Sequence, residues 1–333
     1  MADGLFGIIG NTPLVRLTRV IDAPFRLFGK LEGANPGGSS KDRPAANILR
    51  HAMQSGAIDG NSVVIESSSG NMGIGLAQAC AYYGLPFICV VDPKATKQNL
   101  RILEAYGARI DLVTSPDPES GEFLVARLKR VKSLLASIDN SFWPNQYANE
   151  CNAGAHYRTT IEEIVRDLGG ELDYLFCATS TCGTIMGCAQ LIRERGMTTK
   201  VIAVDAVGSA IFGGEQADRR IPGLGAGIKP PLCQTELIDD CIHVSDLECV
   251  IGCRRLVRDE AILVGGSSGG VLMAIESMKH RIPPRSTCVG VFADRGERYL
   301  DTVYSDEWVS GQFGNVLGLW QPWEDEPCLA ATS

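Results

Sequence analysis

Short apolar runs rich in β-branched residues alternate along this chain with longer segments that have the periodicity of amphipathic helices. The runs predict strands at 26–32, 62–67, 86–92, 108–114, 174–179 and 200–206, with helices from about Arg43, from about Asn71, near 96–106, near 119–137 and from Gly183. Alternating strands and helices form parallel sheets that helices cover on both faces. The predicted fold class is therefore α/β, with ligands expected at the loops that follow the carboxyl ends of the strands.

Length and composition indicate a soluble globular protein. The 333 residues are more typical of two domains than of one, and 45% of them are hydrophobic and 21% charged. The polar, turn-rich segment at 143–154 suits a crossing between two domains. Because no apolar run is long enough to cross a bilayer and the first residues lack a secretory signal, we expect a cytoplasmic protein without a membrane partner.

Charge and cysteine usage argue against two classes of function. The formal net charge of -8 comes without any cluster of Lys and Arg, which argues against a nucleic-acid partner but leaves room for a small anion. The twelve cysteines are spread out, include no CxxC pair and are not flanked by the four histidines at zinc-ligand spacing. We expect no metal and reduced, mostly buried thiols, with Cys249 and Cys253 on the buried face of one helix.

Lys41 follows a Gly/Ser-rich turn in the segment GANPGGSSKDRPA, at 33–45, and opens a predicted helix. The positive end of a helix dipole disfavours a second positive charge, which pushes Lys41 toward the neutral form that attacks carbonyl groups. Spacing alone leaves the alternative of a solvated lysine without a chemical role.

Three loops rich in Gly and Ser or Thr follow strands or open helices. ESSSGNMGIG, at 66–75, is expected to point backbone N–H groups at a substrate carboxylate. ATSTCGTIMG, at 178–187, is expected to hold a phosphate through amides, hydroxyls and the helix dipole. VGGSSGGVLM, at 264–273, carries Ser267, whose hydroxyl could face a ring nitrogen. Helix capping is the alternative role both for Ser267 and for the polar residues of the loop at 66–75. Neither a Walker A nor a GxGxxG motif is present, so a nucleotide is not the leading ligand.

A helix-start lysine, a carboxylate nest, a phosphate loop and a hydroxyl for a heterocycle match the needs of pyridoxal phosphate (PLP). The motifs LEGANPGGSSKDR, SSSGNMG, NQYAN, TSTCGT, GLGAG, GGSSGG and GERYLD occur in the order found in the cysteine synthase and cystathionine β-synthase family of fold-type II PLP enzymes. The chain resembles this family from about Ile8 to Tyr304. The resemblance implies PLP as cofactor, a homodimer, a larger phosphate-binding domain at 1–35 and 146–312, a smaller substrate-binding domain at 36–145 and a tail at 313–333.

The resemblance also implies a role for each site residue. Lys41 would carry the cofactor covalently and act as general base, Asn71 would hydrogen-bond the ring hydroxyl, and Ser267 would face the pyridine nitrogen. The residues implied for the cofactor phosphate are Ser180, Thr181, Cys182, Gly183 and Thr184. Those implied for the substrate carboxylate are Ser68, Ser69, Met72 and Gln146. In this family a neutral serine at the ring nitrogen suits β-elimination and β-replacement better than transamination.

The chain departs from the cysteine synthase pattern within the site. It reads SSGNMG where TSGNTG is usual and STCGT where GTGGT is usual, and Tyr147 stands where phenylalanine is common. These departures, with DRGERYLD and RRIPGLGAG, resemble the siderophore-pathway branch of N-(2-amino-2-carboxyethyl)-L-glutamate synthases, which join O-phospho-L-serine to L-glutamate on the way to 2,3-diaminopropionate. On that interpretation Ser180 and Tyr147 select glutamate, and Arg219 or Arg220 receives the phosphate leaving group unless it is only a solvated loop charge.

Two other functions stay open at this point. One is an O-acetylserine or O-phosphoserine sulfhydrylase that makes cysteine on the same scaffold. The other is a PLP-bound regulatory protein that has lost turnover, against which the intact Lys41 and Ser267 argue.

Overall fold

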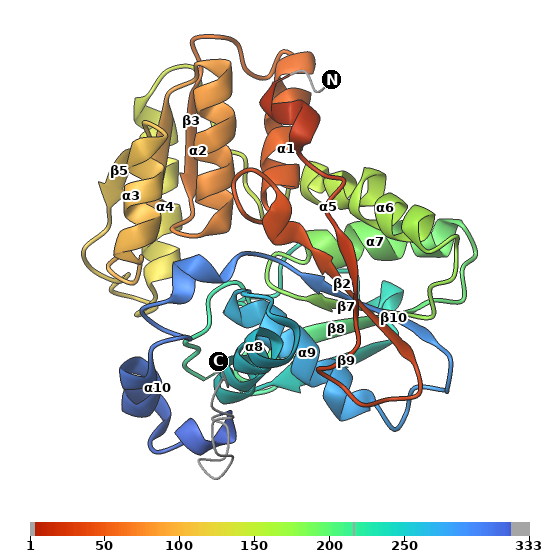
Figure 1. The fold of residues 1–333 in the computed structure, drawn as a ribbon. Coiled ribbons are helices and arrows are strands. Elements are labelled where there is room, and N and C mark those ends of the chain that lie inside the picture. The colour runs from red at the N-terminus through yellow and green to blue at the C-terminus, as the bar shows by residue number, and fades with distance from the viewer. Residues whose placement is uncertain (1–3, 216, 321–333) are drawn as a thin grey trace, which may run out of the picture.

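The protein is described by a computed structural model that covers residues 4–215 and 217–320. The described strands form two sheets, a larger one in the order β1-β2-β10-β7-β8-β9 and a smaller one in the order β5-β4-β3-β6 (Figure 1). The strands are β1 Leu14–Leu17, β2 Arg26–Leu31, β3 Val63–Ser67, β4 Phe87–Val91, β5 Arg109–Leu112, β6 Ser141–Phe142, β7 Tyr174–Ala178, β8 Lys200–Ala206, β9 Asp240–Val244 and β10 Thr287–Phe292. Neighbouring strands are parallel except for the antiparallel pair β1 and β2 at one edge.

Helices cover both sheets, which confirms the predicted α/β class. They are α1 Asp42–Gln54, α2 Asn71–Tyr83, α3 Lys97–Ala105, α4 Phe123–Ser137, α5 Glu150–Arg158, α6 Thr160–Asp167, α7 Gly183–Glu194, α8 Asp246–Glu260, α9 Gly266–Met278 and α10 Asp306–Phe313. In Figure 1, α2, α3 and α4 lie with the smaller sheet, while α5, α6 and α7 lie on one side of the larger sheet and α8 and α9 on the other. Burial on both faces explains why β4 and β10 are apolar at nearly every position.

The chain enters the smaller sheet after β2 and returns to the larger one at β7, so one continuous stretch builds β3 to β6. The strands and helices predicted from the sequence are confirmed, although α4 begins at Phe123 rather than near 119. The turn-rich segment 143–154 runs into α5 at its end, where the Asn149 side chain caps the helix and accepts a hydrogen bond from the Cys151 N–H. The domain boundaries drawn above stay a prediction.

A buried cluster of four charges fixes the start of α1 to the larger sheet. The Arg43 guanidinium lies 2.7 Å from Glu32 and 2.6 Å from Glu163, and the Lys30 ammonium lies 2.7 Å from Glu163. Burial alone would raise the pKa of Glu163, but hydrogen bonds from Arg43 and Lys30 lower it to about 2. Two cations and two anions compensate one another, which holds the chain two residues beyond Lys41 in one position.

Two cysteines of α8 and one tryptophan near the end of the described chain are buried. Cys249 and Cys253 lie on α8 and are fully buried, and the cysteines within the described residues form no disulfide. Trp320 is buried, with the Arg254 guanidinium 5.2 Å from its ring centroid, while Trp323 lies outside the described residues. Within residues 4–215 and 217–320, no helix is long and apolar enough to span a membrane.

Candidate active site

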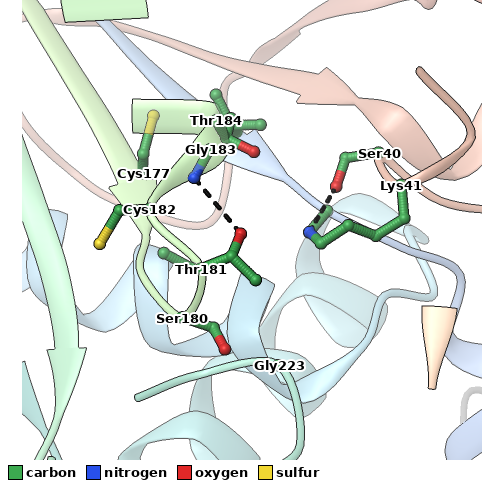
Figure 2. Close-up of a pocket in the computed structure, with 12 residues that line it drawn as sticks. Ser40, Lys41, Cys177, Ser180, Thr181, Cys182, Gly183, Thr184 and Gly223 are labelled. Atoms are coloured by element: carbon green, nitrogen blue, oxygen red, sulfur yellow. Dashed lines mark hydrogen bonds between the residues drawn. The ribbon is translucent and has the colours of Figure 1, made fainter. Parts of the chain in front are cut away.

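Lys41 is the N-cap residue of α1, at the end of a loop that lies along the larger sheet. The Ser40 N–H donates to the Ala293 carbonyl, 2.7 Å away, just past the carboxyl end of β10. The Lys41 ammonium nitrogen lies 3.3 Å from the Ser40 hydroxyl, and its side chain extends toward the loop that follows β7 (Figure 2). Lys41 therefore faces the region where an α/β sheet binds ligands.

Burial lowers the pKa of Lys41, and the negative charges of Asp294, Glu32 and Asp42 only partly oppose this effect. The direction agrees with the neutral lysine expected from the sequence. The main cause is burial, however, and not the helix dipole invoked there. A lysine with a lowered pKa serves both as a nucleophile toward a carbonyl and as a general base.

The predicted phosphate loop lines the same cavity as Lys41. The residues of this loop that line the cavity lie between β7 and the first turn of α7 and are Ser180, Thr181, Cys182, Gly183 and Thr184. The Gly183 N–H donates to the Thr181 hydroxyl, 3.3 Å away, and the sulfur of Cys182 points away from Lys41 (Figure 2). A Cβ at Gly183 would overlap the Asn152 side chain, so this position requires glycine. The hydroxyls and the N-terminus of α7 together suit an anion.

His156, which was not predicted as a site residue, lies behind this loop on α5. Its Nε2 is 3.2 Å from the Thr184 hydroxyl and its Nδ1 is 2.8 Å from the Thr160 hydroxyl. Burial and the positive charges of Lys41 and Arg43 hold the pKa of His156 well below its ordinary value. A neutral imidazole thus orients the Thr184 hydroxyl without adding charge to the anion site.

The predicted carboxylate nest lies between β3 and α2. Gly70, not a serine, is the N-cap residue of α2 and makes no side-chain cap bond. The Ser68 hydroxyl accepts a hydrogen bond from the Gly73 N–H at 3.1 Å, and the Ser69 carbonyl accepts one from the Asn99 side chain at 3.0 Å. The Met72 side chain is packed into the core, so only its backbone is free to serve a ligand.

Asn71 begins α2 and is held by residues from beyond β10. Its Nδ2 donates to Asp294 at 2.7 Å, and its Oδ1 accepts a close hydrogen bond from Arg298. Ser267 is buried in the first turn of α9. The N-cap residue of α9 is Gly265 and no side chain caps this helix, so the alternative that Ser267 is a helix-capping serine is wrong. Their proposed contacts with the cofactor ring stay predictions.

Gln146 and Tyr147 lie on the segment that leaves the smaller sheet, and Glu66 holds that segment in place. The buried Glu66 carboxylate accepts hydrogen bonds from the Trp143 ring N–H at 3.0 Å and from the Gln146 N–H at 3.2 Å. Burial raises the pKa of Glu66 to about 7. Sequence reasoning placed Glu66 at the end of a strand but missed this contact with the segment 143–147.

The Tyr147 hydroxyl lies in the electrostatic field of Arg127, Glu66 and Arg219, while burial raises its pKa and keeps it a neutral donor. Arg127, on α4, was not predicted from the sequence, and it is largely buried with its guanidinium 3.2 Å from Asp92. Arg219 is half-buried, whereas Arg220 is exposed and is fixed through its backbone N–H to Asp246. The positive charge of Arg219 acts on the Tyr147 hydroxyl, and the substrate contacts proposed for Arg219 and Arg220 stay predictions.

Comparison with known proteins identifies the class of this site. The model of the family described as "Pyridoxal-phosphate dependent enzyme" matches residues 5–294. The chain belongs to this family.

Solved structures of the same fold cover nearly the whole chain. A hydrogen sulfide-producing enzyme from Fusobacterium nucleatum is 33% identical, with a TM-score of 0.84 over 90% of this chain and 100% of that one. An O-acetylserine-dependent cystathionine β-synthase from Helicobacter pylori is 32% identical, with a TM-score of 0.85 over 92% and 100% of the two chains. An O-ureido-L-serine synthase is 29% identical, with a TM-score of 0.83 over 93% and 99%. The predicted PLP-dependent synthase is thus confirmed as a class.

The residues at the site fit PLP. An amine of lowered pKa faces an anion-binding loop across one cavity, as an aldehyde cofactor with a phosphate arm requires. Lys41 would hold the aldehyde carbon, and Ser180, Gly183 and Thr184 would hold the phosphate. When bound, PLP withdraws electrons and so makes the substrate Cα–H acidic.

Proposed function

We propose that this enzyme catalyses β-replacement on O-phospho-L-serine with L-glutamate as the amine nucleophile, giving N-(2-amino-2-carboxyethyl)-L-glutamate and phosphate. The observation that carries the proposal is that two guanidinium groups, those of Arg127 and Arg219, exert their positive charge on the Tyr147 hydroxyl. Arginine forks bind carboxylate and phosphate oxygens, and both proposed substrates are anionic. Sulfide needs no such recognition.

Arg219 is the better candidate for the phosphate leaving group. Its Nη1 is buried and has no hydrogen-bond partner within the described part of the chain. A cavity of about 360 Å³ lies beside it, between the start of α4 and the residues Gly208, Ala217, Asp218, Gly227 and Ile228. This volume is within the range of about 300–1,000 Å³ that is usual for small-molecule sites.

Arg127, Tyr147 and Ser180 are the candidates for holding glutamate. Arg127 and Tyr147 approach from the smaller sheet and the segment that follows it, and Ser180 approaches from the phosphate loop beside Lys41. An acceptor bound by Ser180 would lie close to Lys41, because both residues line one cavity. This arrangement explains why the chain has Tyr147 and Ser180 where cysteine synthases usually have phenylalanine and glycine.

The enzyme's own residues then act in a fixed order. Lys41 takes the Cα proton of bound phosphoserine, and the Cβ–O bond breaks so that phosphate leaves with the electron pair toward Arg219. The glutamate amine forms the Cβ–N bond and releases a proton. Lys41 returns its proton to Cα, which balances the exchange of phosphate for the amine.

Replacing Tyr147 by phenylalanine is expected to raise the KM for glutamate about ten-fold or more, because a hydrogen bond to a charged group contributes roughly 1.5–3 kcal/mol. The rate of phosphate release with sulfide as acceptor should change little, since sulfide does not need the hydroxyl. Steady-state phosphate release at varied glutamate concentrations measures the effect. Unchanged glutamate kinetics would remove Tyr147 from the acceptor site.

Replacing Arg127 by lysine tests the arginine fork and keeps a cation beside Asp92. We expect a rise in the KM for glutamate of about ten-fold or more with little change in the KM for phosphoserine, because an ammonium cannot make the paired contacts of a guanidinium. Arg130 lies on the same helix, is paired with Asp111 and is partly exposed, so Arg130→Lys is the matched control. Equal kinetics of the two variants would contradict the assignment.

A sulfhydrylase that makes cysteine is the second candidate. It is favoured by the solved relatives, which include a hydrogen sulfide-producing enzyme and an O-acetylserine sulfhydrylase from Entamoeba histolytica that is 31% identical. The arginines around Tyr147 favour glutamate instead. A regulatory protein without turnover is a weaker candidate, because the lysine and the anion loop are both in place.

A further inference from the structure

The segment that follows β10, DRGERY at 294–299, contacts both Asn71 and the loop before Lys41. Asp294 and Arg298 bind the two ends of the Asn71 amide, and Arg298 also donates to the Gly37 carbonyl. Because Arg298 can only donate, the atom of Asn71 that it meets must be the oxygen. The amide nitrogen therefore faces Asp294, and the orientation of Asn71 is fixed.

Asp294 is an unusual carboxylate. Its side chain is 3% exposed, and its Oδ2 accepts hydrogen bonds from Asn71 and from the Tyr299 hydroxyl. Its Oδ1 is buried without a hydrogen-bond partner among the described residues, and it makes no ion pair within 4 Å there. A buried carboxylate oxygen without a hydrogen-bond partner or a counter-ion destabilises the folded protein, so a functional reason for Asp294 is expected.

Lys41 supplies that reason. Ser39 pairs with Asp294 in an isolated antiparallel bridge, and the Ser40 N–H donates to the Ala293 carbonyl at 2.7 Å, so the chain at Asp294 runs beside the chain that leads into Lys41. Among the negative charges that act on the Lys41 nitrogen, Asp294 also has the largest effect, ahead of Glu32 and Asp42. Glu32 is already paired with Arg43, at 2.7 Å, whereas the charge of Asp294 is not neutralised by a direct ion pair. Asp294 is thus the carboxylate best placed to stabilise a positive charge on this nitrogen.

We propose that Asp294 is a positioning residue of the active site, which orients Asn71 and supplies the negative charge that faces the Lys41 nitrogen when the cofactor is bound. It acts through Asn71 and Lys41 and does not contact substrate. Tyr299 holds the carboxylate in place, and Arg298 holds the other end of the Asn71 amide.

Other charged or titratable groups also face these two residues. Around Lys41 and Asp294 they are Glu32 from the turn after β2, Asp42 and Arg43 from α1, His156 from α5, Cys253 from α8, and Arg298 and Tyr299 from the segment after β10. His156 is neutral, and Glu32 and Arg43 are paired with each other. Asp294 is therefore the group whose loss changes the charge at Lys41 most.

The visible absorption of the holoenzyme, recorded against pH, tests whether the negative charge of Asp294 acts on the Lys41 nitrogen. In Asp294→Asn, which keeps the shape and removes the charge, the band should titrate at least about one pH unit lower than in the wild type, because a negative neighbour stabilises the protonated nitrogen. If the wild-type band does not titrate within the pH range where the protein stays folded but the Asp294→Asn band does, the result equally supports stabilisation of the protonated nitrogen by Asp294. Asp301→Asn, at an exposed carboxylate two residues beyond this segment, is the control that should not shift.

The rate of cofactor release tests the orientation of Asn71. We expect release to be several-fold faster in Asp294→Asn than in Asp301→Asn. If Asp294→Asn fails to fold or to retain cofactor, Tyr299→Phe replaces it. Burial raises the pKa of Asp294 and the Tyr299 hydrogen bond lowers it, so loss of that bond favours the neutral carboxyl and should shift the band by a smaller amount in the same direction. An unshifted band in whichever variant is used would overturn the role of the charge, and unchanged release would overturn the positioning of Asn71.

Discussion

Replacing Lys41 by alanine is expected to lower the rate of phosphate release from O-phospho-L-serine by about a thousand-fold or more. A positioned general base contributes roughly 10²–10⁴-fold, and the same residue also forms the covalent link to the cofactor. Because Lys41 is partly buried and burial disfavours its charge, the variant should fold as well as the wild type. The thermal unfolding midpoint should therefore change little.

Phosphate release and the absorption spectrum together measure this outcome. The alanine variant should lose the visible band of covalently held cofactor along with turnover, while Lys132→Ala, at an exposed lysine on α4, should keep both. A Lys41→Ala enzyme that retained turnover within ten-fold of the wild type would show that another residue performs the proton transfer.

Replacing Glu163 by glutamine is expected to lower the free energy of unfolding by about 3–5 kcal/mol, because the change leaves the buried charges of Lys30 and Arg43 with only Glu32 as a partner. The pair formed by Arg26 and Glu171 provides the matched control. It has a similar separation of 2.6 Å, but its side chains are 43% and 68% exposed. Glu171→Gln should cost less than about 1 kcal/mol.

Urea unfolding of the two variants and the wild type measures the difference, and equal midpoints for the two variants would contradict the role given to the cluster. The pH dependence gives a second reading. Since the pKa of Glu163 is lowered from 4.5 to about 2 in the folded protein, its contribution is present above pH 4.5 and is lost as the pH falls toward 2. Glu163→Gln should lack this part of the acid sensitivity.

The elements that position the site follow from local patterns. Short apolar runs predict β3, β7 and β8, and turns rich in Gly, Ser or Thr predict the starts of α1, α2 and α7, because hydrophobic periodicity and turn residues act over a few neighbouring positions. Lys41 and the loop 180–184, which are 139 positions apart at their closest, line one cavity as expected. Parallel topology brings such loops to one edge of a sheet.

The residues that surround the site are set by tertiary contacts and have no such local signal. His156 meets Thr184 only because α5 packs on α7. Likewise, the charge of Arg127 on α4 reaches the Tyr147 hydroxyl only through the tertiary fold. The sequence likewise shows DRGERY as a motif without revealing that its Asp and Arg hold Asn71. The Asn149 cap of α5 was readable in principle, since Asn before a helical segment is a common start signal.

The acceptor depends on contacts that vary within one fold. The solved relatives named above are a hydrogen sulfide-producing enzyme, a cystathionine β-synthase and an O-ureido-L-serine synthase, all at similar identity to this chain. The scaffold is thus compatible with several acceptors, and the choice must come from side chains such as Arg127, Tyr147 and Ser180. The choice of acceptor nucleophile by this enzyme therefore requires a direct experiment.

Mass spectrometry of the product formed in competition provides that experiment. The purified holoenzyme is given O-phospho-L-serine with L-glutamate, sulfide and homocysteine at equal concentrations, and the products are quantified before any substrate is exhausted. We predict that N-(2-amino-2-carboxyethyl)-L-glutamate is the main product. Cysteine or cystathionine as the main product would contradict the proposal that the arginines around Tyr147 select glutamate.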